Sequence, residues 1–296
     1  MVRHGHRGGR LGDVKFLPNG VHGAVPWVAR AVWTLVGLLA PWAELADGRS
    51  GPVTGVLNGW GWLLWGSVLL ALLVPSTVSL TAVRAVAPLV FLAALASGDS
   101  ASIAAAVAAV AVLWHRDIAD ALVQGSAYGA ETRFCLRTPL VHVLAAVPAW
   151  SAWVGGIVGG SLLVVAGNPA VGAGLLAVGA LLTRTVPQRL HRFSRRWLVL
   201  VPSGIVVHDH VVLAETVMVR RSNLSKVQEV QSGGEPADLT GGTFGRRIGF
   251  VLTNAEKVIL TPIARRVLGT SEALHVQSFV VNPVRREAAL GRLLSR

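Results

Sequence analysis

Long runs of hydrophobic residues, separated by short polar connections, follow one another between residues 26 and 183. An α-helix rises about 1.5 Å per residue, so about 20 apolar residues cross the hydrocarbon core of a bilayer, which is about 30 Å thick. The runs that approach this length are Pro26–Ala43, Leu57–Val74, Val78–Ser97, Ser100–Trp114, Thr138–Gly167 and Pro169–Thr183. The pattern predicts a membrane α-helical bundle of about six transmembrane helices. The third and fourth runs have short apolar cores, which leaves a half-inserted or surface-lying pair open as an alternative for them.

The pattern changes to short, alternating runs after residue 196. Strands are predicted at 197–201, 204–209, 215–220, 248–253, 257–261 and 274–281. The segment 248–261, IGFVLTNAEKVILT, predicts a hairpin whose turn holds Asn254. Asn282 and Pro283 suit the N-cap and first position of a closing basic helix, Val284–Leu294. This order of strands and helix predicts a small β-barrel plugged at one end by the helix.

Two segments of this region resemble a known family. The run RRWLVLVPSGIVVHD, residues 195–209, and the run IGFVLTNAEKVILTP, residues 248–262, are similar to the bacterial pleckstrin-homology-like (PH-like) domain of multi-pass bacterial membrane proteins. The resemblance covers about residues 196–294. It implies a cytosolic binding or assembly module and not an enzyme, and no lipid-binding motif of the family can be placed on residues of this chain.

Composition supports the division into a membrane part and a water-exposed part. The chain has 296 residues, of which 52% are hydrophobic and 14% charged, whereas soluble domains carry about 25% charged residues. Its mean hydropathy is +0.57. This apolar content excludes intrinsic disorder for most of the length, and the single cysteine, Cys135, excludes a fold built on disulfides.

The distribution of charge predicts an orientation. Lys and Arg number 27 against 15 Asp and Glu, a net charge of +12, and most of the excess lies after residue 183. Short loops rich in Lys and Arg stay in the cytoplasm. The connection between the first two runs holds Arg49 among Glu44 and Asp47, whereas the N-terminal tail and the region after Thr183 are basic. We therefore expect a multi-pass protein of the cell (inner) membrane with both termini in the cytoplasm.

Four regions follow from these patterns: a basic N-terminal tail (1–25), a transmembrane helical domain (26–183), a basic juxtamembrane linker (184–196) and a cytosolic PH-like β domain with a C-terminal helix (197–296). The last region is expected to fold separately, because the basic stripe before it should stay hydrated.

Basic residues near the bilayer are the first candidate binding site. Each such residue gains about 1 kcal/mol near an anionic leaflet. The predicted contacts to lipid headgroups or to a protein partner are Arg184, Arg189, Arg192, Arg195 and Arg196 in the linker, and Phe244, Arg246 and Arg247 beside the Gly-rich loop Gln231–Gly245. A stop-transfer signal and a disordered strand connection are the plainer alternatives. Nucleic acid is not expected, since the stripe is held at the membrane.

Glycine spacing predicts close helix packing. Gly155 with Gly159, and Gly156 with Gly160, form two overlapping GxxxG frames in the fifth run. Packing inside a hairpin of the fifth and sixth helices is favoured, with dimerisation and a hinge as alternatives, so the oligomeric state stays open.

Candidate chemistry is sparse. His115, Asp117, Asp120 and Glu131 lie in the polar connection 115–137, but their spacing matches no metal motif, and His208-Asp209-His210 is more typical of a turn. Arg30, Arg84 and His142 stand near helix ends, where long side chains can reach the headgroups. No catalytic residue, metal or cofactor is expected.

These patterns favour a non-catalytic membrane scaffold or adaptor, whose PH-like domain binds a protein partner or anionic headgroups. A lipid or small-molecule transporter subunit is the alternative if the Gly-rich helices line a cavity. A membrane enzyme acting on a lipid is third, and converging carboxylates beside residues 115–131 would favour it.

Overall fold

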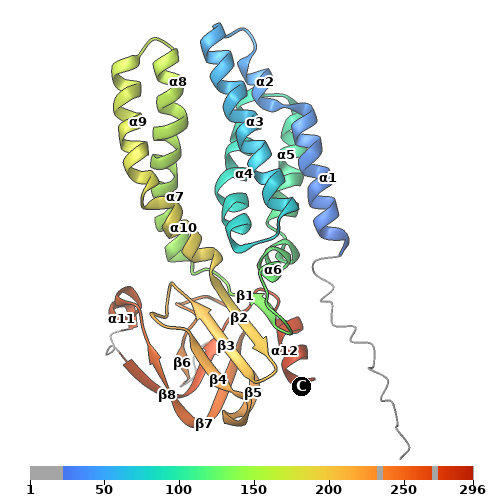
Figure 1. Cartoon of the computed structure of the whole chain (residues 1–296), viewed down its shortest axis with the longest axis vertical. Helices are drawn as coiled ribbons and strands as arrows, with labels where there is room; N and C mark the ends of the chain where they lie inside the picture. The colour runs from blue at the N-terminus through green and yellow to red at the C-terminus, as the bar shows by residue number, and fades with distance from the viewer. Residues whose placement is uncertain (1–22, 232–235, 269–272, 296) are drawn as a thin grey trace, which may run out of the picture.

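A computed structural model describes residues 23–231, 236–268 and 273–295 of the chain. Two groups of helices stand side by side above a region of β-sheet (Figure 1). Most of the predicted basic tail, and Gly233 and Gly234 of the predicted Gly-rich loop, lie outside the described residues.

The first helical group contains the first four predicted runs. It comprises α1 (Ala24–Leu39), α2 (Pro41–Ala46), α3 (Gly51–Leu73), α4 (Thr77–Ser97), α5 (Ser100–Leu113) and the short α6 (Arg116–Gln124). The first run is broken at Ala40, which is left-handed at φ 43° and precedes a proline. Trp33 and Trp65 join α1 to α3, because each indole donates to the other's carbonyl, at 2.9 and 2.8 Å.

The second helical group is a tight hairpin. It contains α7 (Leu140–Val154), a π-helical turn (Gly155–Gly159), α8 (Gly160–Val165), α9 (Pro169–Thr183) and α10 (Val186–Ser194). A Cβ added to Gly156 would lie 2.8 Å from backbone atoms of Gly179, and one added to Gly160 would lie 2.9 Å from Leu176 N. The Gly156/Gly160 frame therefore packs within the hairpin, as predicted. Gly155 and Gly159 have open space at the same positions.

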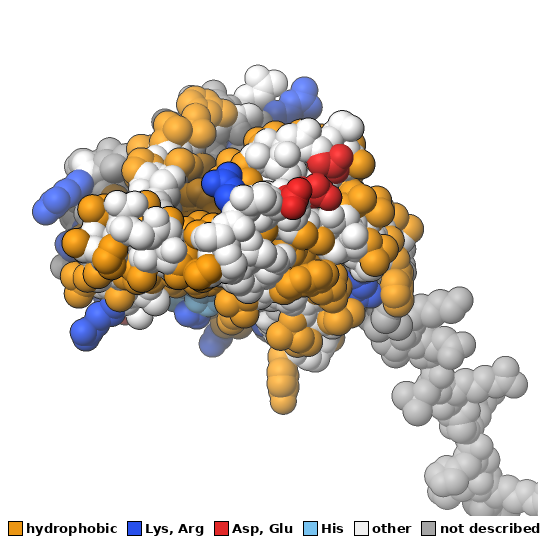
Figure 2. Space-filling view, turned by 90° about the horizontal axis from the view of Figure 1, so that it is seen from above, with side chains coloured by type: hydrophobic (Ala, Val, Ile, Leu, Met, Phe, Trp, Pro, Cys, Tyr) orange, Lys and Arg blue, Asp and Glu red, His pale blue; other side chains and the backbone are white. Residues whose placement is uncertain are grey.

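The helices have the length and composition of membrane spans. Among the described residues, four are long and apolar enough to cross a membrane: α1 with α2, α3, α4, and α7 continued through α8. Two bent pairs, α5 with α6 (58°) and α9 with α10 (42°), raise the number to six if each pair is one span. Figure 2 shows hydrophobic side chains over much of the surface seen from the end of the helices, with few charged ones among them. The predicted helical membrane region is thus present, with four to six candidate spans.

The C-terminal region consists of two four-stranded sheets around one core. The first has the order β1 (Thr132–Cys135), β2 (Arg196–Val201), β3 (Gly204–Asp209), β4 (Val217–Arg220). The second has the order β5 (Leu224–Val230), β7 (Arg247–Ile259), β8 (Ala273–Val281), β6 (Ala237–Asp238). Leu198, Leu200, Phe250 and Phe279 are fully buried between them.

The expected closed β-barrel is not formed. A 3₁₀ turn, Arg221–Asn223, ends β4 and redirects the chain into β5, which pairs with β7 and leaves β4 at a sheet edge. Helix α12 (Arg286–Leu294) closes the fold as predicted, and the short α11 (Pro262–Leu268) was not predicted.

Two local predictions in this region are wrong. The segment 248–261 is not a hairpin, because β7 is one strand that pairs with β8 on both sides of an irregularity between Val251 and Glu256. The amide side chain of Asn223 holds the backbone of Asn254, at 2.7 and 3.1 Å, which supports this irregular stretch. Asn282 does not cap the last helix: its buried side chain donates to Thr243 and to the Phe244 carbonyl.

The first sheet takes one strand from the helical region. β1 belongs to the connection between α6 and α7, and it pairs with β2 from Thr132 opposite Leu200 to Cys135 opposite Trp197. From its sequence this connection was expected to be a polar loop, since four residues are too few to show alternation. The sheet therefore extends beyond the predicted boundary at residue 197.

Candidate functional site

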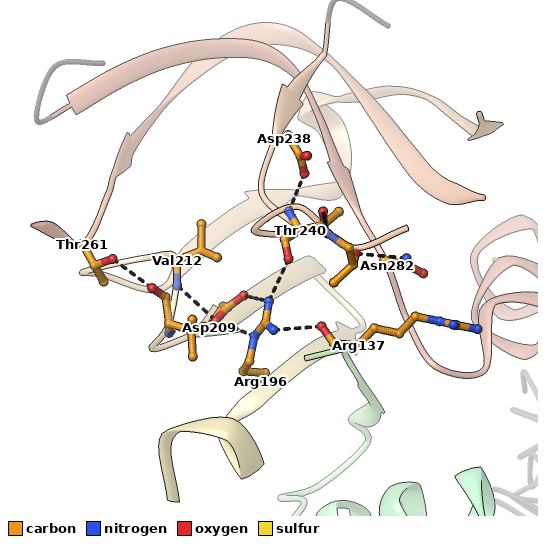
Figure 3. A network of polar contacts seen from close by, with 10 residues as sticks. Arg137, Arg196, Asp209, Val212, Asp238, Thr240, Thr261 and Asn282 are labelled. Carbon is orange, nitrogen blue, oxygen red and sulfur yellow. Dashed lines mark hydrogen bonds and ion pairs between the residues drawn. The ribbon is translucent and has the colours of Figure 1, made fainter. Parts of the chain in front are cut away.

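A buried ion pair lies where the helices meet the sheets (Figure 3). Arg196 and Asp209 form two hydrogen bonds of 2.8 Å, and both side chains are fully buried. The Arg196 guanidinium also donates to the carbonyls of Arg137, at 2.8 Å, and Thr240, at 3.1 Å. Asp209 accepts further bonds from the backbone N–H of Val211 and Val212. This network fixes β2, β3 and the residues that lead into α7.

The predicted basic stripe is therefore not one continuous surface. Arg196 was expected to contact headgroups, but burial in its ion pair removes it from the surface. Arg195 is partly buried and lies 3.4 Å from His208 Nε2. Arg184, Arg189 and Arg192 are exposed, and their contact with lipid stays a prediction.

The predicted contact residues after the Gly-rich loop also differ from one another. Phe244 is 79% exposed. Arg246 is exposed and lies 3.6 Å from Glu229, whereas Arg247 is held by Asp238 at 3.1 Å and by the Thr243 carbonyl. Phe244 and Arg246 remain available for contact, and Arg247 supports the loop.

The polar connection before α7 forms a junction of helix, strand and C-terminal helix. Asp120 of α6 is buried and accepts from the Cys135 backbone N–H at 2.9 Å. Arg285 lies 3.9 Å from Asp120 and 3.4 Å from Asp117, and Glu131 pairs with Arg133 at 2.6 Å. The charges of this connection thus pair with one another and with the C-terminal region.

His208 and His210 make aromatic contacts and are not in a metal-binding arrangement. His208 stacks on Trp197, with ring centroids 4.6 Å apart, and Arg133 lies over the same indole. Burial, followed by the positive charges of nearby His210 and Arg195, lowers the pKa of His208 to about 4. Within the part of the chain that the structure describes, no three His, Cys, Asp or Glu side chains are grouped to hold a metal ion.

A cavity of about 440 Å³ lies between the two helical groups, on the side of the sheets. Its lining is mostly apolar and comes mainly from α4, α7 and α10: Thr81, Arg84, Ala85, Pro88, Trp114, Thr138, Val143, Ala146, Val147, Trp150, Leu190 and Phe193. The Trp150 indole of α7 donates to the Ala85 carbonyl of α4 at 2.8 Å and so joins the two groups at the cavity wall. Ligand pockets commonly measure roughly 300–1,000 Å³, so the cavity is large enough for a small molecule or part of a lipid.

Two arginines of the helical region differ in their surroundings. Arg30 donates two bonds to the Leu72 carbonyl, at 3.0 and 3.1 Å, and lies over the Trp27 ring. Arg84 is half-buried in the cavity wall, and no hydrogen bond or ion pair joins its guanidinium to another described residue. Within the part of the chain that the structure describes, Arg84 is thus an unpaired cation in a mostly apolar cavity.

From the sequence, Arg84 was interpreted as a residue near a helix end. The cavity around it could not be predicted, because it forms only when α7 and α10, which are distant in the sequence, pack beside α4. No protein-family model, curated protein or solved structure matches the chain. The candidate site is therefore described from its own geometry.

Proposed function

We propose that this chain is an integral membrane protein that binds a membrane amphiphile between its two helical groups and serves as a non-catalytic adaptor at the membrane. The single observation that carries this proposal is the apolar cavity of about 440 Å³ between α4, α7 and α10. It refines the adaptor favoured by the sequence by naming what the membrane part would bind.

The walls of the cavity suit an acyl chain. Val143, Val147 and Trp114 are partly exposed, at 39%, 53% and 48%, so the apolar lining continues onto the outer surface of the helices. In a bilayer that surface would face lipid, and a chain could move into the cavity without crossing water. Burial of its apolar surface against protein would add dispersion contacts.

The connections of the cavity to the sheets support an adaptor role. Leu190 and Phe193 of α10 line the cavity, and α10 leads directly into β2. The residues before α7 are held by Arg196 and continue back into β1. A ligand that changed the spacing of α4, α7 and α10 would therefore move two adjacent strands of the first sheet.

We infer the remaining features from the sequence. Two sheets closed by a C-terminal helix are compatible with a PH-like binding module, and the charge bias favours the cytoplasm for this region. The exposed Arg184, Arg189 and Arg192, together with Phe244 and Arg246, would then contact anionic headgroups or a protein partner.

A transporter subunit is supported less well. The sequence favoured that function if the Gly-rich fifth and sixth helices lined a cavity, and the fifth does so in part, through Val143, Val147 and Trp150 of α7, whereas the glycines pack the hairpin. None of the residues that line the cavity is a glycine.

Native mass spectrometry of the full chain, released from detergent micelles, tests the proposal. We expect one retained lipid per chain. Ala146→Trp should abolish retention, because Ala146 lines the cavity. The matched control is Val178→Trp, at a position 48% exposed on α9, which should retain the lipid. An unliganded wild-type chain, or equal retention by a folded Ala146→Trp variant, would overturn the proposal.

A further inference from the structure

The cavity carries a charge that its own neighbours do not balance. Arg84 lies seven residues after Thr77, the first residue of α4, which places it about 10 Å along the helix. A guanidinium in apolar surroundings is costly unless it is paired. Within the described parts of the chain, Arg84 has no ion pair, whereas Arg133 and Arg196 are each bound to a carboxylate.

The groups near Arg84 cannot supply the missing anion. Its electrostatic neighbour is the thiol of Cys135. Burial raises the pKa of the Cys135 thiol well above its usual value, so the thiol stays neutral. Asp120 accepts a hydrogen bond from the Cys135 backbone N–H, and its negative charge is partly balanced by Arg285. Among the described residues, Arg84 is thus left without a paired carboxylate.

The polar groups of the cavity lie toward the sheets. Thr81 belongs to the turn of α4 before Arg84, and Thr138 precedes α7. Pro88, Val147 and Trp150 line the cavity further along their helices, away from the sheets. A molecule with an anionic end and an apolar chain would match this order, with its anion at Arg84 and its chain beside Trp150.

Exposed cations stand next to the same place. Arg189 and Arg192 of α10 are exposed, and the adjacent residues Leu190 and Phe193 line the cavity. Clustered positive charge raises the local concentration of anionic lipids at a membrane surface. The positive potential would therefore favour the same class of ligand that Arg84 requires.

We propose that the cavity selects a membrane lipid with an anionic headgroup, held by an ion pair with Arg84. This inference rests on the proposed function and adds the chemical class of the ligand. A guanidinium forms paired hydrogen bonds with a phosphodiester. The apolar walls require the chain of a lipid, so a free anion would occupy only a part of the site.

Competition between two lipids tests the selectivity. The full chain in detergent is mixed with equal amounts of phosphatidylglycerol and phosphatidylcholine, and the bound lipids are counted by native mass spectrometry. We expect a preference for phosphatidylglycerol of about tenfold, the effect of one charge-assisted pair. Arg84→Gln should reduce the ratio to about one, and Arg84→Lys should restore part of it. Arg220→Gln, exposed on β4 and absent from the cavity lining, is the control and should keep the preference.

The outcomes separate this inference from the proposed function. Equal binding of both lipids by the wild type, with displacement by Ala146→Trp, overturns the anionic selectivity and keeps the cavity as a lipid site. An unchanged ratio in Arg84→Gln also overturns the inference. If Arg220→Gln removed the preference, the selectivity would come from the overall positive charge of the chain, which would overturn the role of Arg84. The absence of any bound lipid overturns both proposals.

Discussion

At the scale of single residues, two arginines that are wholly or partly buried differ in whether a partner balances their charge. Arg196 is fully buried and has four hydrogen bonds, two of them to Asp209. Arg84 lies in a cavity wall without a partner among the described residues. Both stand in basic or apolar sequence that gives no sign of this difference. Arg196 is expected to contribute to stability, and Arg84 to binding.

Replacement of Arg196 tests the structural role. Arg196→Met leaves the buried Asp209 unpaired, which commonly costs about 3–5 kcal/mol. We expect a large fall in the thermal midpoint of the full chain, measured by circular dichroism. Arg192→Met, at an exposed position of α10, is the control and should change the midpoint little. Equal stability of the two variants would contradict the role of the network.

His208 predicts a pH dependence of the sheet region. Its pKa is lowered by burial to about 4, from the usual 6.5, so the folded state binds the proton less well than the unfolded state. Stability is fully present above about pH 6.5 and is lost as the pH falls toward 4. Because His208 is partly exposed, we expect a loss of roughly 1 kcal/mol by pH 4.5.

The variant His208→Gln should remove this part of the acid sensitivity. His275→Gln, an exposed histidine on β8, is the matched control and should keep it. Thermal midpoints measured from pH 7.5 to 4.5 make the comparison. Parallel curves for wild type and His208→Gln would show that the acid loss arises elsewhere.

At the scale of elements, the hydrophobic runs predicted the helices well, and the alternating runs predicted β2, β3, β4 and β8 to within two residues, but other strands were missed. The sixth run matches α9, Pro169–Thr183, because an unbroken apolar run between polar residues has one stable conformation in lipid. β1 and the continuous β7 were missed, since their partners are distant in the sequence. Of the candidate site, the sequence pointed to Arg84, and it could not show that α7 and α10 pack beside it.

The structure predicts different effects of alanine substitution in the two GxxxG frames, although their spacing in the sequence is the same. Gly156→Ala and Gly160→Ala place a Cβ under 3.0 Å from the backbone of α9, and overpacking of this kind costs roughly 1–3 kcal/mol. Gly155→Ala and Gly159→Ala meet open space and should be neutral or stabilising. Resistance of the full chain to thermal unfolding in detergent distinguishes the pairs. Equal effects in both frames would contradict the packing of the hairpin.

At the scale of the whole molecule, the helices and sheets are connected by strand, ion pair and helix. β1 enters the first sheet from the helical region, Arg196 binds the residues before α7, and α10 passes directly into β2. These three links favour a single unit over two independent domains joined by a linker. Their position places the sheets at one end of the helices (Figure 1).

Labelling of introduced cysteines tests the orientation. The native Cys135 is buried, so its background reactivity should be low. We expect Asp47→Cys, between α2 and α3, to react with a membrane-impermeant maleimide in intact cells. Lys226→Cys, exposed on β5, should react only after the membrane is opened. Labelling of Lys226→Cys in intact cells would place the sheets outside and remove the proposed adaptor role.

The proposed lipid in the cavity between α4, α7 and α10 can be located by photo-cross-linking. The probe is a phosphatidylglycerol that carries a diazirine in its acyl chain, and the adducts are mapped by mass spectrometry. We expect adducts concentrated on cavity residues such as Val147, Trp150 and Leu190. Adducts spread evenly over exposed positions such as Leu38 and Leu181, with none enriched in the cavity, would contradict it.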